Sequence, residues 1–304
     1  MQVSLIVLRQ TAAMFLLMAV GFALYKAKRI DEPGSRSIAS ALLYAVMPAT
    51  LINSLLLECT PANTALLARS TLAAAAAMLL SVAAARLIYR KSGVEAFAAA
   101  FSNAGFVGIP LVQAAFGADA SFCIVGYMVL LCFLQYTYGV ALLTGEALSF
   151  RPAALAKNPV IWGTAIGLAL YFGGFGSSLP SLLTSFLGSL AGLNAPLGMI
   201  LLGVYLAQSE LGATFTTPRL YGLCAVRLVL IPLLTAALLF LLPLSHELKL
   251  CLLIASAAPV GAGAATYAQL FGGDYRYAGQ AVALSSLLSV ATLPLVLMAA
   301  ALFL

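Results

Sequence analysis

One stretch of the chain, SNAGFVGIPL at residues 102–111, places polar and helix-breaking residues in the middle of an apolar segment. Four of its residues either disfavour a regular helix or offer an amide: Asn103, Gly105, Gly108 and Pro110. Proline removes a backbone donor and clashes with the preceding turn, so we expect the helix to break there. Backbone groups freed at membrane depth must be satisfied by protein, water or a ligand. The stretch therefore predicts a cavity that binds a substrate, and a proline kink filled by neighbouring helices is the alternative.

A second stretch, SAAPVGAG at residues 256–263, interrupts another apolar segment in a similar way. Its helix-breaking residues are Pro259, Gly261 and Gly263. The two interruptions are followed by the related sequences FGAD and FGGD, which start at Phe116 and Phe271, 155 positions apart. Corresponding interrupted segments in the two halves of a transporter point to its substrate site.

Arg227 lies near the middle of a third apolar segment, residues 218–242. A central arginine costs about 2.5–3.5 kcal/mol on membrane-insertion scales, and such residues usually face the interior of the helix bundle. One interpretation is a counter-charge for an anionic substrate. The other is an arginine that snorkels, or that binds carbonyls freed by a neighbouring broken helix.

The composition indicates a protein that crosses the membrane several times. Of 304 residues, 63% are hydrophobic and only 8% are charged, whereas soluble chains carry about 25% charged residues. Apolar runs predict an all-α fold of ten spans, near residues 6–25, 36–57, 65–89, 96–116, 120–145, 159–176, 180–207, 218–242, 248–271 and 277–303.

The longest predicted linker, residues 146–158, divides these spans into two sets of five. We therefore expect two repeats, 1–150 and 151–304. An odd number of spans in each repeat makes the second copy enter the membrane from the opposite side, so the repeat is inverted.

Lysine and arginine in the predicted loops set the expected orientation. Eleven lie on one side: Lys26, Lys28, Arg29, Arg36, Arg86, Arg90, Lys91, Arg151, Lys157, Arg219 and Arg276. The other side has three: Arg9, Arg69 and Lys249. This split predicts that both termini are periplasmic or extracellular. The expected location of this multi-pass protein is a bacterial inner membrane. The basic residues are spread over short loops, so we expect no nucleic-acid partner.

Three regions carry a family resemblance: NAGFVGIPL at 103–111, Asn158 with Pro159, and residues 257–274 followed by Leu287-Leu288-Ser289 and Pro294. These motifs resemble those of the auxin efflux carrier family of membrane permeases, over nearly the whole chain and in a compact, bacterial-type form. The region from 257 to 294 also resembles bile-acid/sodium symporters of the same wider superfamily.

The resemblance implies ten helices in two inverted repeats, with spans 1, 2, 6 and 7 as a scaffold and spans 3–5 and 8–10 as a mobile transport domain. Interrupted helices four and nine would cross at the substrate site. In the family, the asparagine of the span-four motif contacts the substrate carboxylate, and Asn103 matches it. Plant members usually have proline before this asparagine, where this chain has Ser102.

We expect a secondary transporter, a permease that moves a small organic anion such as a carboxylate by elevator-type alternating access. The alternative is a sodium-coupled symporter of a larger amphipathic organic acid. A membrane-embedded enzyme or sensor would need a titratable pair or metal ligands within the spans. The sequence offers neither there, and its five cysteines lack metal-site spacing. We therefore expect no enzyme activity, no catalytic residue and no metal site.

The acidic residues all fall at or near predicted span ends, which leaves no carboxylate in the core to relay protons. We expect the anion to move down its own electrochemical gradient, without a proton gradient. A coupling sodium ion held by neutral oxygens is the runner-up, and no other cofactor is expected. The expected partners are the organic anion and the lipid bilayer, and a homodimer is left open.

Overall fold

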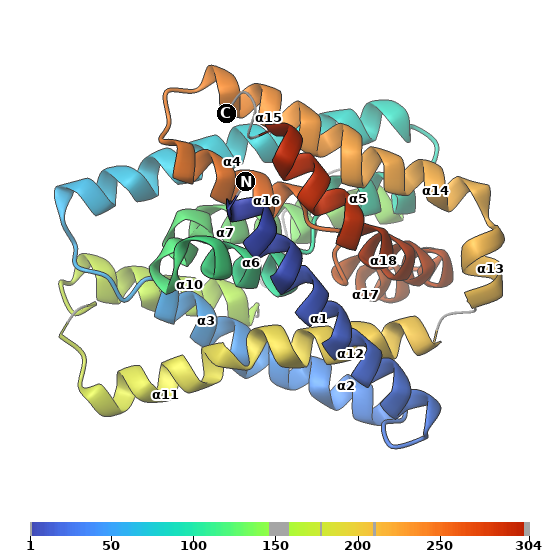
Figure 1. Ribbon diagram of the computed structural model, residues 1–304, viewed down its shortest axis with the longest axis horizontal. Coiled ribbons are helices and arrows are strands. Elements are labelled where there is room, and N and C mark those ends of the chain that lie inside the picture. The colour runs from blue at the N-terminus through green and yellow to red at the C-terminus, as the bar shows by residue number, and fades with distance from the viewer. Residues whose placement is uncertain (1, 146–157, 177, 209–210, 301–304) are drawn as a thin grey trace.

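The structure is a computed structural model that describes residues 2–145, 158–176, 178–208 and 211–300 (Figure 1). The described residues are helical apart from their connecting segments, and the extended backbone pairs only at one isolated bridge. The helices, with π-helical and 3-10 turns marked η, are α1 (Gln2–Lys26), α2 (Glu32–Ala41), η1 (Leu42–Val46), α3 (Met47–Ser54), α4 (Pro61–Ile88), α5 (Gly93–Ala100), η2 (Ala104–Gly108), α6 (Ile109–Phe116), η3 (Ala118–Ile124), α7 (Val125–Leu134), η4 (Gln135–Gly139), α8 (Val140–Thr144), α10 (Pro159–Phe172), α11 (Ser181–Gly192), α12 (Asn194–Gln208), α13 (Leu211–Thr216), α14 (Pro218–Ala225), η5 (Val226–Leu230), α15 (Ile231–Leu241), α16 (His246–Ala257), α17 (Gly263–Leu270) and α18 (Tyr275–Ala300).

Among the residues that the structure describes, six helical segments are long and apolar enough to cross a membrane: Glu32–Ser54, Pro61–Ile88, Ala118–Thr144, Ser181–Gln208, Pro218–Leu241 and Tyr275–Ala300. Shorter apolar helices cover Ala104–Phe116 and Pro159–Phe172. Helix occurs within every one of the ten predicted spans, and the all-helical prediction is confirmed. The number of membrane crossings stays a prediction.

The interruptions of the predicted fourth and ninth spans are also confirmed, but the first does not lie at its proline. Helix α5 ends at Ala100 and η2 begins at Ala104, whereas Pro110 lies in the first turn of α6. The expectation that Pro110 breaks the helix is therefore wrong. The π-helical turn η2 explains the difference, because Ile109 N donates to Ala104 O, five residues back. This wider turn leaves room for the proline ring.

The same arrangement recurs in two other segments. Turn η1 precedes Pro48 and turn η5 precedes Pro232, and each proline is the second residue of the following α-helix. A proline that follows a π-helical turn thus continues a membrane helix with a local irregularity, whereas the breaks fall elsewhere.

The helices pack in two groups. The first helix group consists of α1, α2, α3, α10, α11 and α12; α1 lies along α12, and α3 packs on α10 and α11. The second helix group contains α4–α8 and α14–α18, and its centre is α16, in which every residue from Leu248 to Ala257 is buried. In Figure 1, α2, α3, α11 and α12 form the lower edge, and α4, α14 and α15 form the upper edge.

Glycines let α1 and α12 approach closely. A Cβ atom on Gly21 would lie 2.0 Å from Ile200 O, and one on Gly203 would lie 1.9 Å from Met18 O. Neither position has room for a side chain, so the two backbones are in direct contact.

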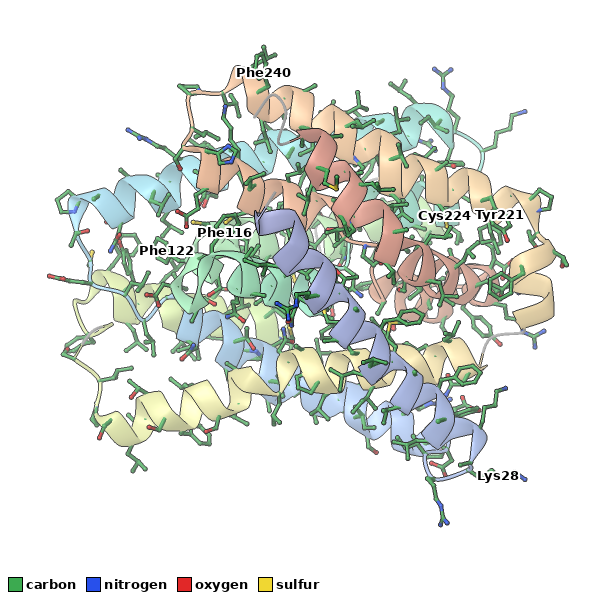
Figure 2. The ribbon with its side chains drawn as sticks, viewed as in Figure 1. Lys28, Phe116, Phe122, Tyr221, Cys224 and Phe240 are labelled. Carbon is green, nitrogen blue, oxygen red and sulfur yellow. The ribbon has the colours of Figure 1, made fainter. Side chains whose placement is uncertain are left out.

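The links between helices alternate between two ends of the molecule. The links α1–α2, α4–α5 and α13–α14 lie on the right in Figure 1, and the link α3–α4 and the described residues that follow α10 lie on the left. Figure 2 correspondingly shows Lys28 and Tyr221 on the right and Phe116 and Phe122 on the left. The right end thus holds the links in which most of the described basic loop residues occur. Arg151 and Lys157 lie outside the described residues.

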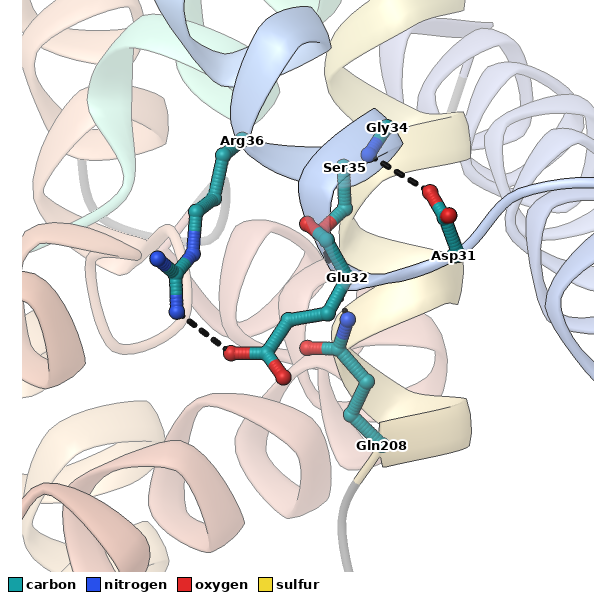
Figure 3. A network of polar contacts seen from close by, with 6 residues as sticks. All are labelled: Asp31, Glu32, Gly34, Ser35, Arg36 and Gln208. Atoms are coloured by element: carbon teal, nitrogen blue, oxygen red, sulfur yellow. Dashed lines mark hydrogen bonds and ion pairs between the residues drawn. The ribbon is translucent and has the colours of Figure 1, made fainter.

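A small polar network fixes the link between α1 and α2 (Figure 3). Asp31 caps the first turn of α2. Glu32 binds Arg36 across one helical turn, with 2.6 Å between Oε1 and Nη2. Gln208 Nε2, at the end of α12, donates to Ser35 Oγ over 3.2 Å. The network ties the ends of α2 and α12 together within the first helix group.

Candidate functional site

The breaks in the two interrupted spans lie against each other. Residues 101–103 follow α5 and residues 258–262 follow α16. The two segments run antiparallel where they pair, with a bridge between Ser102 and Val260. Two hydrogen bonds join them: Asn103 N to Pro259 O (2.8 Å) and Gly261 N to Phe101 O (3.1 Å). The breaks therefore satisfy part of each other's backbone, as burial requires.

Two of the predicted glycines lie at close contacts between the interrupted spans. A Cβ atom on Gly261 would lie 3.0 Å from Ser102 O, and one on Gly108 would lie 3.3 Å from Ala255 Cα in α16. Alanine at either position would require the facing backbone to move by a few tenths of an ångström.

Arg227 binds the ends of both helices that stop at the breaks. It lies in η5, its side chain is fully buried, and all of its hydrogen bonds found here go to backbone carbonyls. The acceptors are Ala99 O (2.9 Å), Ala100 O (3.4 Å), Ala258 O (3.2 Å) and Ser256 O. These are the contacts expected for an arginine that binds carbonyls of a broken helix. Contact between Arg227 and a substrate stays a prediction.

Asn103 lies at the crossing and keeps an unused donor. The residue is 5% exposed, and its carbonyl accepts a hydrogen bond from Val107 N over 3.0 Å. Its side-chain Nδ2 has no hydrogen-bond partner among the described residues. Leaving such a buried donor unpaired costs about 1–3 kcal/mol, so any acceptor that reached this amide would be bound favourably.

Asn194, at the start of α12, brings a second amide to the same place from the first helix group. Its Nδ2 donates to Gly105 O over 2.8 Å, and its Oδ1 has no partner in the part of the chain that the structure describes. The sequence signal was an asparagine close to Pro196 within an apolar span, but its contact with Gly105, 89 residues away, could not be read from it.

Apolar side chains pack against two glycines close in sequence to these amides, Gly105 and Gly198. A Cβ atom on Gly105 would lie 2.9 Å from Met47 Cε and 3.2 Å from Met128 Cε. Gly198, four residues after Asn194, faces the side chain of Phe106. Methionine side chains are flexible and fill irregular spaces, so they can pack closely on Gly105.

The other two predicted site residues, Pro110 and Gly263, lie in helices that follow the paired backbone. Pro110 is buried in the first turn of α6. Gly263 begins α17, where a Cβ atom would lie 3.2 Å from the ring of Tyr267 and 3.7 Å from Gln135 Nε2. Gln135 is buried in η4 and was not singled out from the sequence.

Two buried serines also act at the breaks. Ser102 Oγ lies 3.1 Å from Tyr127 OH, and Ser285 Oγ of α18 accepts a hydrogen bond from Val260 N over 3.1 Å. Both hydroxyl groups therefore help to hold the extended segments in place. The serine at 102 was noted in the sequence only as a departure from the family motif.

Glu95, in the first turn of α5, is a buried carboxylate that the sequence placed only at a span end. Its side chain is 5% exposed and binds Arg219 through both oxygens, at 2.5 and 2.6 Å. Tyr277 OH donates to Glu95 Oε1 over 2.9 Å. The ion pair joins α5 to α14, and the tyrosine adds α18.

A protein-family model described as "Membrane transport protein" matches residues 6–154 and 146–297. The chain belongs to the membrane transport protein family. The resemblance to auxin efflux carriers found in the sequence is thereby confirmed. A search of curated proteins finds no match for the chain. Together with its apolar helices, this membership makes the chain a multi-pass membrane transporter.

Proposed function

We propose that this member of the membrane transport protein family is a secondary transporter of small organic anions such as carboxylates. The substrate would bind where the breaks after α5 and α16 meet. The observation that carries the proposal is the unpaired Nδ2 donor of Asn103 at this crossing. A carboxylate accepts hydrogen bonds from such a donor and would remove the cost of leaving it unpaired.

The unpaired Oδ1 of Asn194 adds a requirement on the substrate. A carboxylate alone repels this carbonyl oxygen, whereas a hydroxyl or N–H group beside the carboxylate would donate to it. The best ligand would therefore carry an acceptor for Asn103 and a donor for Asn194.

Elevator-type movement is supported by the division of the helices into two groups. Most of the crossing belongs to the second helix group, and Asn194 reaches it from the first. Near the site, the two groups meet where Met47 packs on Gly105 and Phe106 packs on Gly198, and Asn194 adds a hydrogen bond to Gly105 O. Such a surface can slide at low cost. The first group would be the scaffold and the second the transport domain.

We further propose ten membrane spans in two inverted repeats, 1–150 and 151–304, in a bacterial inner membrane with both termini outside. The alternation of the links and the basic residues at one end support this orientation. Cys59, the only exposed cysteine of the five, lies in the α3–α4 link. In intact cells, an impermeant maleimide should label the wild-type protein but not Cys59→Ser. Labelling of Cys59 only after the membrane is opened would reverse the orientation.

The proposed driving force is the electrochemical gradient of the anion itself. An anion leaving a cell that is negative inside gains about 2.3 kcal/mol per charge per 100 mV. Glu95 does not change this proposal, because its carboxylate is held by Arg219 and Tyr277. The alternative, sodium-coupled symport of a larger amphipathic acid, needs oxygen atoms that are free to hold the ion.

The test is uptake by purified protein in proteoliposomes, with a panel of labelled organic acids and with membrane potential, sodium and pH gradients imposed separately. We expect saturable uptake that follows the membrane potential alone. Accumulation driven only by a pH gradient, at constant ionisation of the substrate, would contradict the proposed driving force. Absence of uptake for every acid would contradict the substrate class.

A further inference from the structure

The guanidinium of Arg227 lies where the carboxyl ends of two half-helices converge. Two of its acceptors, Ala99 and Ala100, are the last residues of α5, and the other two, Ser256 and Ala258, lie at the end of α16. Helix carboxyl ends expose carbonyls without intrahelical partners. Arg227 donates hydrogen bonds to these carbonyls in both interrupted spans.

The charge of Arg227 is balanced by these carbonyls and not by a carboxylate. No ion pair found among the described residues involves Arg227, and the nearby carboxylate of α5, Glu95, is bound to Arg219. Each helix carboxyl end carries about half a negative charge. Two such ends supply about one negative charge, which matches one guanidinium.

Carbonyl oxygens at broken helices and half-helix carboxyl ends are the groups that hold sodium ions in ion-coupled transporters. Two hydroxyl groups lie next to them, since Thr235 Oγ1 is 2.9 Å from Ser256 Oγ. In this protein, the positive charge beside these carbonyls is the guanidinium group of Arg227. The residues present therefore do not fit a sodium ion at the crossing, because Arg227 already occupies the oxygen atoms that would bind it.

We propose that Arg227 is a fixed internal cation that replaces a mobile coupling ion, and that its removal opens a binding site for a monovalent cation such as sodium. The consequence for coupling rests on the proposed transport function. The cation site itself does not, so its test measures binding in the absence of any organic anion.

The experiment compares the thermal unfolding of purified wild-type protein, Arg227→Ala and Arg227→Lys in sodium chloride and in choline chloride at equal ionic strength. Wild-type protein and Arg227→Lys keep a positive charge at this position, so both should unfold at the same temperature in the two salts. Arg227→Ala should be less stable in choline. Titration with sodium should then raise its unfolding temperature saturably, by about 5 °C or more.

Three outcomes would overturn the proposal. The first is a folded Arg227→Ala variant that responds equally to sodium and choline. The second is an Arg227→Ala variant that cannot be recovered folded in either salt while Arg227→Lys can. The third is saturable stabilisation of the wild-type protein by sodium. Recovery of Arg227→Ala only when sodium is present would support the proposal. Failure to transport organic anions would leave all of these results unchanged.

Discussion

At the crossing, one set of buried polar groups is fully hydrogen-bonded and another is not. On one side, four carbonyls at the ends of α5 and α16 are bound by Arg227, which is fully buried. On the other side, Asn103 keeps an unpaired donor and Asn194 an unpaired acceptor. One interruption of the helices therefore produces both a closed structural site and an open one. We infer that the closed side holds the breaks in shape and that the open side receives the ligand.

The largest expected effect comes from Arg227→Ala in the absence of sodium. Its removal leaves four buried carbonyls without their donor, so we expect a loss of about 3–5 kcal/mol in the free energy of unfolding. Denaturant titration of the purified protein in choline chloride measures it. A loss below about 1 kcal/mol would show that the carbonyls do not need Arg227, and the distinction between the two sides would fail.

Asn103→Ala should act on binding and not on stability. Removing the amide takes away the donor for a carboxylate, so we expect about 10- to 100-fold weaker substrate affinity. The free energy of unfolding should be unchanged or slightly higher, because an unpaired buried donor is lost. Calorimetric titration and denaturant unfolding of the same sample test both parts.

The matched control for Asn103→Ala is Asn63→Ala. Asn63 lies in the first turn of α4, and its Nδ2 donates to Glu58 O in the link before that helix. This variant should keep its affinity. Equal affinity of wild-type protein and a folded Asn103→Ala variant would remove Asn103 from the site.

Asn194→Ala should have a smaller effect on affinity, about 3- to 10-fold, since it removes one neutral hydrogen bond to Gly105 and one unpaired acceptor. The informative measurement compares two acids that differ by one hydroxyl group beside the carboxylate. Wild-type protein should prefer the hydroxylated acid, and the variant should lose most of this preference. An unchanged preference would place the donor of the ligand elsewhere.

The smallest effect is expected for Arg219→Ala. Arg219 lies eight residues before Arg227, and its side chain is 63% exposed. Solvent screens its ion pair with Glu95, and Tyr277 still binds the carboxylate, so we expect a loss of about 1 kcal/mol. High salt should reduce the difference from the wild type. If Arg219→Ala lost as much free energy of unfolding as Arg227→Ala, the difference in exposure between the two arginines would not explain their contributions to stability.

The helices and the two interrupted spans could be predicted from the sequence, because apolar length and the positions of glycine and proline are local properties. The exact place of the first break could not, since a π-helical turn accommodates Pro110 and the backbone departs from helix at residues 101–103. Whether a proline breaks a helix depends on the hydrogen bonds of the preceding turn, which residue type alone does not reveal.

The partners of the site residues could not be predicted in the same way. Arg227 was expected to bind either a substrate or freed carbonyls, and only the packing of η5 against α5 and α16 identifies its acceptors. The burial of Glu95 depends on Arg219, 124 residues away. The second amide, Asn194, comes from a helix in the other group. Such contacts depend on how distant segments pack together.

The short antiparallel pairing of the breaks has a consequence for the register of the site. In extended backbone, successive side chains point in opposite directions. Ser102 lies at the bridge and turns toward Tyr127, so we expect Asn103, the next residue, to turn the other way. Deleting or inserting one residue between Ala100 and Asn103 would exchange these directions. Asn103 would then face the tyrosine, and the site would receive a neighbouring side chain without its amide, although the composition of the chain would hardly change.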